Sequence, residues 1–349
     1  METVMRVPLR DANDAKSFLI RNDLMDFSRT FDKDKRYIYF PIKKKVATKT
    51  DFRYTIIERE LAEKPIQESF KEAVKKHLSK DELELLKTSY DAVGDIAILE
   101  IDDELRKKEK LIAETLLESN AAIKTVLRKS GSHFGVFRTQ KMIHLAGEKK
   151  KETVHKENDI ELKLDVEKVY FSVRLSTERK RVAQQVKTDE RILVLFSGCA
   201  PYPCVLAKNA EPKYVCGVEI NPDGHRYGLE NVKRNKLKNV YLSNRDAKKT
   251  EKILKDFKDI PDFDPHFDRI LMPLPKSAAD FLDAALFFAK KDTIIHFYDF
   301  LHEDEFEQAH QKIKEACERH LMGHEIIETV KCGQHAPHIF RICVDFRVF

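Results

Sequence analysis

From Arg191 onward, short apolar runs alternate with amphipathic stretches, and this alternation leaves few folds open to the chain. The apolar runs are RILVLF, YVCGVEI, NVYLSN, FDRILMPL and DTIIHFYDF, and each is followed by a stretch with helical periodicity. Short buried strands separated by helices of about 10 to 15 residues are typical of a parallel, doubly wound sheet. The sequence therefore predicts an α/β domain in this half of the chain.

The last two apolar runs break the alternation. GHEIIETVKC and IFRICVDFRVF have only GQHAPH between them, which is too short for a helix, so we expect an antiparallel hairpin at the edge of the sheet. Five α/β units closed by a hairpin form the Rossmann-like sheet of class I methyltransferases. Dinucleotide dehydrogenases usually keep a parallel sheet throughout.

The first half of the chain has a mixed α+β pattern. Strands are predicted at VMRVPL, RYIYFPI and FRYTIIERELA, with a helix over Ala12–Leu24. After Pro65 a second module begins, with helices over Phe70–Leu78 and Glu104–Leu117 and strands at DIAILEI and AAIKTVLRK. We therefore expect two smaller α+β domains ahead of the α/β domain, with boundaries at 1–62, 63–165 and 166–349.

Composition limits the classes of protein that remain. The 349 residues are 42% hydrophobic and 35% charged, and no apolar stretch approaches the roughly 20 residues that span a bilayer. The start of the chain lacks the apolar core of a signal peptide, so we expect a cytoplasmic protein without a membrane partner. Because no C-x-x-C pair occurs, we expect buried thiols rather than zinc ligands or disulfides at Cys199, Cys204, Cys216, Cys317, Cys332 and Cys343.

The net charge of +5 permits a polyanionic partner without requiring one. Basic runs occur at Lys43–Lys45, Lys149–Lys151, Arg179–Arg181 and in KRNKLKN from Lys233. Each run alone is typical of a solvated surface, whereas the four together are compatible with a nucleic-acid partner.

The first predicted strand of the α/β domain leads into a turn that is poor in glycine. Phe196 ends this strand, Gly198 allows close backbone approach to a ligand, and Pro201 suits the first turn of the next helix. A single glycine is a weak match to the G-x-G-x-x-G pattern that accommodates a pyrophosphate. The turn therefore argues against NAD.

Two acidic residues stand at the ends of the next two strands. Glu219 can accept both hydroxyl hydrogens of a ribose, and Asp246 can accept from an adenine amino group. Either residue alone is more often an N-cap of the following helix. Both together, behind a turn of small residues, favour an adenosine ligand without pyrophosphate, and S-adenosylmethionine fits best.

Two further segments flank this predicted site. The fourth strand ends in Met272-Pro273-Leu274-Pro275-Lys276, whose prolines place a stiff loop beyond the strand. This loop either lines the pocket of a flipped-out base or simply ends the strand. Before the sheet, Ser176 or Thr177 can cap a helix that begins at Glu178 and projects Arg179 and Arg181 beside the first strand.

Eight short motifs in order resemble the archaeal and eukaryotic tRNA (guanine-37-N1)-methyltransferases and their relatives that act on the wyosine precursor. They are HLAGE (144–148), VHKEN (154–158), VYFSVRLSTER (169–179), the strand-one turn, VEINP (218–222), the P-L-P-K loop, IIHFYDF (294–300) and the final A-P hairpin. The resemblance covers nearly the whole chain, although each motif is weak when taken alone.

The resemblance implies S-adenosylmethionine as cofactor and tRNA as partner. Glu178 would be the general base that removes the N1 proton, and basic side chains would hold the anticodon stem-loop. The N-terminal domain would touch the tRNA elbow, and we expect a monomer that binds no DNA. Cofactor contacts would come from Arg179, Phe196, Gly198, Glu219, Ile220, Asp246, Ala247 and Pro273.

Three segments depart from the family pattern. The usual D-M-F-A-G-V-G reads Val194-Leu195-Phe196-Ser197-Gly198-Cys199-Ala200, and the Asn of N-L-P is Pro273, also a candidate catalytic position. The catalytic arginine matches Arg138 in kind, whereas the ungapped match is Gln140. Two alternatives therefore stay open: a methyltransferase that acts on carbon of the wyosine precursor at position 37, and a tRNA-binding protein that has lost catalysis.

Overall fold

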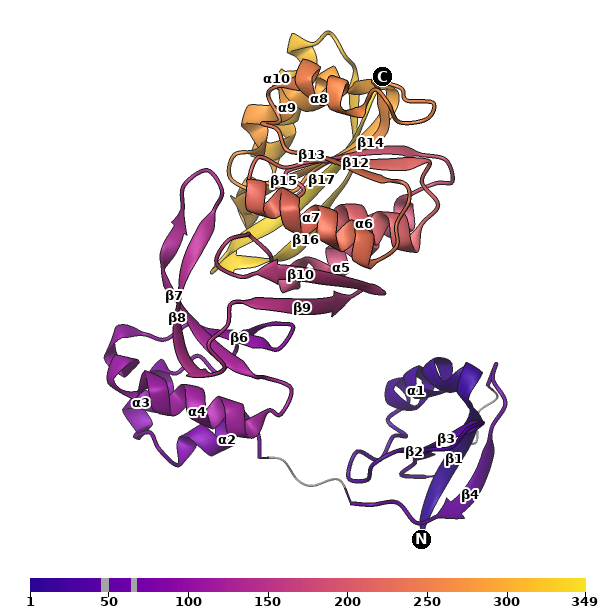
Figure 1. The fold of residues 1–349 in the computed structure, drawn as a ribbon, viewed down its shortest axis with the longest axis vertical. Helices are drawn as coiled ribbons and strands as arrows, with labels where there is room; N and C mark the ends of the chain where they lie inside the picture. Colours follow the sequence, from indigo (N-terminus) through magenta and orange to yellow (C-terminus); the bar gives the residue numbers. More distant parts are fainter. Residues whose placement is uncertain (45–49, 64–67) are drawn as a thin grey trace. The chain divides into compact units, whose positions relative to one another are not determined.

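The computed structural model describes residues 1–44, 50–63 and 68–349 (Figure 1). The chain divides into two compact units, Met1–Glu72 and Ala73–Phe349. The boundary expected near residue 165 therefore lies inside the second unit.

In its described residues, the first unit forms an antiparallel sheet that packs against helix α1. The strand order is β2-β3-β1-β4, and α1 packs Ala15 and Leu19 onto the sheet beside Met5 and Phe40. The predicted helix is three residues too long, because Asp23 adopts a positive φ of 51° and Leu24 N–H bonds back to the Leu19 carbonyl. The elements are β1 Glu2–Pro8, α1 Ala12–Arg21, β2 Asp32–Lys33, β3 Tyr37–Pro41 and β4 Thr55–Arg59.

Helix α2 spans the division between the two units, and the second unit continues with a small α+β region. Its four-stranded sheet has the order β5-β6-β7-β8, and a separate hairpin, β9–β10, follows. The helix expected over Phe70–Leu78 ends at Lys75, and the helix expected from Glu104 starts as a 3-10 helix. Elements α3, β5 and β8 were not predicted. The elements are α2 Phe70–Lys75, α3 Lys80–Leu85, β5 Asp91–Val93, β6 Ile96–Leu99, η2 Asp103–Lys108, α4 Glu109–Ser119, β7 Thr125–Phe134, β8 Thr139–Gly147, β9 Glu152–Glu157 and β10 Ile160–Asp165.

The main sheet has seven strands in the order β13-β12-β11-β14-β15-β17-β16. The first five strands in this order are parallel, and β17 pairs antiparallel with both β15 and β16. The predicted class I methyltransferase sheet with its terminal hairpin is therefore confirmed. The strands are β11 Arg191–Leu195, β12 Tyr214–Val218, β13 Val240–Ser243, β14 Phe267–Met272, β15 Ala289–His302, β16 His324–Ala336 and β17 Ile339–Val348.

Helices cover both faces of this sheet because successive strand residues point to opposite sides (Figure 1). On β11, Leu193 and Leu195 pack with α8, α9 and α10, whereas Ile192 and Val194 pack with α5, α6 and α7. The helices are α5 Ser176–Gln185, α6 Pro201–Asn209, α7 Pro222–Arg234, α8 Thr250–Phe257, α9 Leu282–Phe287 and α10 Glu307–Arg319.

One buried amide ties the β9–β10 hairpin to the first turn of the sheet. Asn231 of α7 is fully buried, accepts from the Lys163 backbone N–H at 2.7 Å and donates to the Cys199 carbonyl at 2.9 Å. This side chain fixes the turn after β11 against a neighbouring element.

Most of the thiols are buried, as the sequence predicts. Five of the six thiols are buried, Cys332 is half-buried, and none forms a disulfide. Among the described residues, no helix combines the length and apolar character needed to cross a membrane.

Candidate active site

The residues that follow four parallel strands line one cavity at the carboxyl edge of the sheet. Phe196 follows β11, Glu219 follows β12, Asp246 lies shortly after β13, and Pro273 follows β14. The cavity encloses about 260 Å³ and is also lined by Arg179, Gly198, Ile220 and Ala247. The fold thus brings together all the residues predicted to contact the cofactor, at the edge where doubly wound sheets bind ligands.

The turn after β11 adopts a backbone conformation that usually requires glycine. Phe196, Gly198 and Ala200 have φ values of 58°, 56° and 64°. For a residue with a Cβ, this left-handed conformation costs on the order of 1 kcal/mol. The turn is therefore tight although it contains a single glycine, and Ala200 is one of the residues held in the strained left-handed conformation.

Glu219 holds this turn from the next strand. Its Oε2 accepts the Gly198 backbone N–H at 2.6 Å, and its Oε1 accepts the Asn221 N–H at 2.7 Å. Burial raises the pKa of Glu219, and these backbone N–H groups partly oppose that rise. Because each carboxylate oxygen has a second lone pair, Glu219 can brace the turn and still accept from ribose hydroxyls.

Arg179 supplies a buried guanidinium to the cavity wall. It is 1% exposed, and its Nε and Nη2 donate to Glu157 at 2.5 and 2.6 Å. Burial opposes ionisation of Glu157, but His155 and Arg179 lower its pKa below the usual value. The charge of Arg179 is thus balanced by Glu157. Arg179 can therefore bind a ligand carboxylate through directed hydrogen bonds rather than as an isolated charge.

The adenosine end of the cavity combines apolar and acidic groups. Ile220 remains 37% exposed at the cavity wall, and Ala247 is buried. Phe281 packs edge-on against Phe196, with ring centroids 4.8 Å apart. With Asp246 beside them, these groups suit a flat base that carries an amino group.

Arg138 reaches the loop after β14 from the distant β7–β8 hairpin. Its Nη1 donates to the Pro275 carbonyl at 2.6 Å, and its Nη2 donates to Ser277 Oγ at 3.0 Å. Burial lowers its pKa below the usual value. Gln140 is buried instead with its amide on the Gly131 carbonyl at 2.5 Å. Of the two candidate positions, only Arg138 lies at the cofactor cavity.

A second, larger cavity of about 800 Å³ adjoins the first. Arg138, Tyr170 and Phe171 line both cavities, so the two spaces meet at these side chains. The larger cavity also carries Arg341 and Lys276 and is much more polar than the first. It has the size and the donors to admit a nucleobase.

Glu178 lies behind this site, because it lines neither cavity. Its carboxylate accepts two hydrogen bonds from Arg181, at 2.7 and 2.8 Å, and one from the Tyr298 hydroxyl at 2.7 Å. Tyr298 in turn accepts from the hydroxyl of Tyr202, which lines the cofactor cavity, at 2.9 Å. Two tyrosine hydroxyls therefore connect Glu178 with the cavity wall.

The predicted side-chain cap before Glu178 is wrong. Helix α5 begins at Ser176, after a 3-10 turn over Val173–Leu175, and no side chain caps it. The Asn158 amide, from the β9–β10 turn, donates to the Ser176 carbonyl at 2.9 Å and contacts its Oγ at 3.3 Å. A hydrogen bond from a distant part of the chain thus engages Ser176, which we expected to cap its own helix.

A buried charge network continues from Glu178 to β17. Arg181 bridges Glu178 and Asp345, and Asp345 also bonds His296 Nδ1 at 2.7 Å. Burial alone would raise the pKa of Asp345, but His296 and Arg181 hold it well below its usual range. Both arginines of the basic run at Arg179–Arg181 therefore pair with buried carboxylates and do not form the solvated surface that is typical of such a run.

Asp345, His296 and Cys343 also place three potential metal ligands within 4.8 Å of one another. His296 Nε2 lies 2.8 Å from Arg269, and Arg181 donates to Asp345. Two guanidinium groups therefore already occupy the space and the lone pairs that a cation would need.

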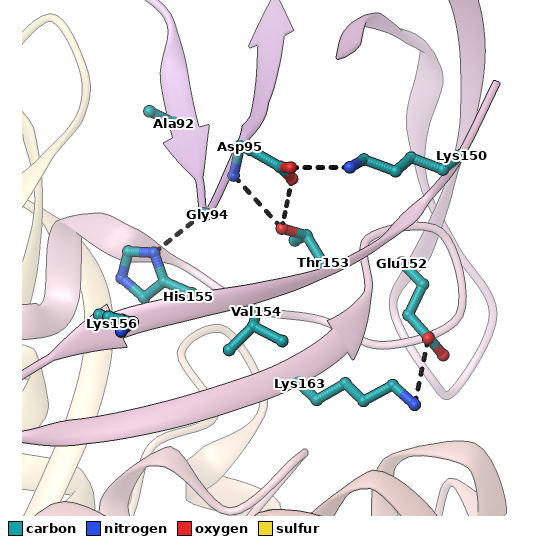
Figure 2. A pocket seen from close by; sticks show the side chains of 10 residues that line it. All are labelled: Ala92, Gly94, Asp95, Lys150, Glu152, Thr153, Val154, His155, Lys156 and Lys163. Carbon is teal, nitrogen blue, oxygen red and sulfur yellow. Dashed lines mark hydrogen bonds and ion pairs between the residues drawn. The ribbon is translucent and has the colours of Figure 1, made fainter. Parts of the chain in front are cut away.

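A third cavity, of about 650 Å³, lies between the β5–β6 turn and β9. Figure 2 shows the side chains that line it. Its lysines are already paired: Lys150 with Asp95 at 2.7 Å and Lys163 with Glu152 at 3.1 Å. Lys151, which belongs with Lys150 to the basic run Lys149–Lys151, also pairs with Glu167. Lys156, which also lines this cavity, pairs with Glu161 at 3.0 Å, so each of its three lysines already has a carboxylate partner. For the run at Lys43–Lys45, Lys45 lies outside the described residues.

Sequence reasoning missed several residues around the two cavities. Tyr170, Tyr202, Tyr298 and His335 were not singled out, although all four contribute to the cavity walls or to the contacts of Glu178. Tyr298 lies inside the apolar run IIHFYDF, and a hydroxyl in a buried strand needs a hydrogen-bond partner. This requirement could have identified Tyr298 from the sequence as a residue with a specific hydrogen-bond partner.

Family comparisons agree with this geometry. The TRM5/TYW2 methyltransferase domain matches residues 153–327, the TYW2 N-terminal domain matches 70–150, and the tRNA methyltransferase 5 N-terminal domain matches 5–50. The chain is similar to the tRNA (guanine(37)-N(1))-methyltransferase Trm5b of Pyrococcus abyssi, with 33% identity over all of this chain and 99% of the relative. It is also similar to the tRNA 4-demethylwyosine(37)-methyltransferase Taw21 of Saccharolobus solfataricus, with 33% identity over 73% of this chain and 92% of the relative.

Solved structures give the same picture. The crystal structure of P. abyssi Trm5b aligns over 100% of this chain and 99% of its own, with a TM-score of 0.70 and 32% identity. A complex of aTrm5 with tRNALeu aligns over 99% of both chains, with a TM-score of 0.69 and 29% identity. P. horikoshii TYW2 in complex with MeSAdo aligns over 80% of this chain and 98% of its own, with a TM-score of 0.65 and 28% identity. The protein therefore belongs to the TRM5/TYW2 family of methyltransferases.

Proposed function

We propose that this protein is an S-adenosylmethionine-dependent tRNA methyltransferase that modifies N1 of guanine 37. The observation that carries the proposal is the junction of the two cavities at Arg138. A cofactor-sized space opens there onto a polar space that can admit a base. The full-length similarity to proteins named Trm5b supports the same reaction.

The residues of the smaller cavity fit S-adenosylmethionine. Glu219 would accept the ribose hydroxyls, Asp246 the adenine amino group, and Arg179 would donate to the methionine carboxylate. Ile220 would cover a face of the adenine. The bound cofactor supplies an electrophilic methyl group on a sulfonium.

The transfer needs a proton acceptor and a group that stabilises charge on the base. Guanine N1 would take the methyl group that the bound cofactor supplies, the carbon–sulfur electron pair would remain on sulfur, and the N1 proton would have to leave. Removal of that proton shifts negative charge toward O6, where the Arg138 guanidinium would stabilise it. Since Glu178 is reached through Tyr298 and Tyr202, we propose that the proton passes along these hydroxyls, each of which already donates toward Glu178.

The three segments 1–62, 63–165 and 166–349 would then have different roles on one tRNA. We propose that the first contacts the elbow, that the second helps to hold the anticodon stem-loop, and that the third carries the reaction. The protein would act as a cytoplasmic monomer without DNA or membrane partners.

A second substrate has one observation in its favour. Pro273 lines the cofactor cavity and has no side-chain amide with which to read guanine. A tricyclic wyosine precursor would rely less on such a contact, and relatives named Taw21 and Taw22 act on 4-demethylwyosine at position 37.

Nucleoside mass spectrometry separates the candidates. Unmodified tRNA and tRNA carrying the precursor are each incubated with the protein and S-adenosylmethionine. We expect 1-methylguanosine at position 37 of the unmodified tRNA, and methylation of the precursor alone would reject N1 as the target. Calorimetry with S-adenosylmethionine, alone and with tRNA, tests the inactive alternative, because absence of binding in both would reject every enzymatic candidate.

A further inference from the structure

The end of the β16–β17 hairpin carries an exposed aromatic ring beside the larger cavity. His335 lines this cavity, and its imidazole packs on Phe300 with ring centroids 4.3 Å apart and an angle of 31° between the planes. The Arg341 guanidinium lies 5.0 Å from the centre of the same Phe300 ring. The imidazole remains solvent-exposed although it rests on Phe300.

Two irregularities in β16 aim side chains at this cavity. The pairing with β17 passes from Lys331 to Gly333 and from Gln334 to Ala336, so Cys332 and His335 are extra residues in their strand. Such bulges redirect side chains and are common beside active sites. Both extra residues line the larger cavity. The hairpin therefore presents His335 to the cavity by its backbone geometry.

The charge around His335 suits a nucleotide. Lys276 and Arg341 line the same cavity, and neither forms an ion pair within the described residues. Arg341 Nη2 donates to Tyr170 Oη at 3.0 Å, while its buried Nε has no hydrogen-bond partner in the described part of the chain. Burial, Lys276 and Arg341 together lower the pKa of His335, which favours the neutral form of its imidazole. A flat ring in one cavity with two cations that form no ion pair among the described residues matches a nucleobase with its phosphate.

From this arrangement we propose that His335 and Phe300 form a stacking site for a nucleobase that flanks the target base in the anticodon loop. Lys276 and Arg341 hold the phosphate of that nucleotide. The site lies across Arg138 and Tyr170 from the cofactor cavity, so a base stacked there keeps the loop open while its neighbour enters the junction. The proposal rests on the proposed function, because it places an anticodon loop in the larger cavity.

The test uses the full-length protein and anticodon stem-loop RNAs that carry 2-aminopurine at position 36 or at position 38. Stacking quenches 2-aminopurine, so we expect one of the two RNAs to lose fluorescence on binding. His335→Ala should abolish this quenching and weaken RNA binding by roughly 5- to 150-fold, the range found when a base-stacking aromatic is removed. His335→Phe should restore both. His338→Ala is the matched control, because His338 lies on the same hairpin but pairs with Glu303 outside the cavity.

Unchanged quenching and affinity in His335→Ala would overturn the proposal. Calorimetry with S-adenosylmethionine checks that each variant is folded, and if His335→Ala fails that check, His335→Phe is compared with His335→Leu. Equal quenching in those two variants would then also overturn it. Failure of the proposed function is distinguishable, since wild-type protein would then form no 1-methylguanosine, whatever the fluorescence shows.

Discussion

Replacement of Glu219 by glutamine tests the proposed cofactor site with the smallest change of shape. The carboxylate accepts two backbone N–H groups, from Gly198 and Asn221, and has lone pairs left for the ribose. A glutamine has one acceptor oxygen and one donating NH2 group, so one backbone N–H loses its acceptor and one ribose hydroxyl loses a charged partner.

The size of the effect follows from those lost bonds. A hydrogen bond to a charged group contributes about 1.5–3 kcal/mol, so S-adenosylmethionine should bind roughly 10- to 150-fold more weakly to Glu219→Gln. The buried N–H without an acceptor should lower the free energy of unfolding by about 1–3 kcal/mol. Calorimetry measures the affinity, and urea unfolding measures the stability.

The control and the pH dependence sharpen this test. Glu251→Gln removes an exposed carboxylate on α8 and should change neither quantity. A protonated Glu219 resembles glutamine, and burial raises its pKa above the ordinary 4.5. Wild-type affinity should therefore be full above that raised pKa and fall as the pH drops through it. An unchanged dissociation constant in Glu219→Gln would refute the assignment of this carboxylate to the ribose.

Three further variants test other parts of the site. Glu178→Gln should keep cofactor affinity while methylation in single-turnover assays falls by roughly 100-fold or more, and unchanged turnover would show that Glu178 is not the base. Ala200→Gly should raise the free energy of unfolding by about 1 kcal/mol, because glycine relieves the φ of 64°, and a lower urea midpoint would contradict this strain. Asp345→Asn should destabilise the protein by about 3 kcal/mol at pH 7. Because the pKa of Asp345 is depressed in the folded protein, this difference from wild type should shrink below the ordinary value of 3.8, and a difference independent of pH would reject the network.

The sheet was predictable because its information is local. Each strand and the helix after it lie within a short stretch, and the period of the apolar residues identifies both. The ends of those strands, including Glu219 and Asp246, were located by the same reasoning, since parallel strands bring their carboxyl ends to one edge.

The surroundings of Glu178 were not predictable in this way. Its partner Tyr298 is 120 residues distant, and Arg138 meets Pro275 across 137 residues. No local pattern encodes such contacts. The end of α1 and the start of α5 were missed for related reasons, because a positive φ at Asp23 and a contact from Asn158 decided them. The bulges that direct Cys332 and His335 leave no signal in the apolar pattern of β16.

The most direct measurement is the fate of a labelled methyl group. Wild-type protein is mixed in excess with S-adenosylmethionine labelled in the methyl group and an unmodified tRNA transcript that carries guanine at position 37. A matched transcript carries adenine there. We predict that the label appears as 1-methylguanosine at position 37 of the first transcript only. Binding of the cofactor and of both RNAs without label at guanine 37 would contradict the proposed reaction.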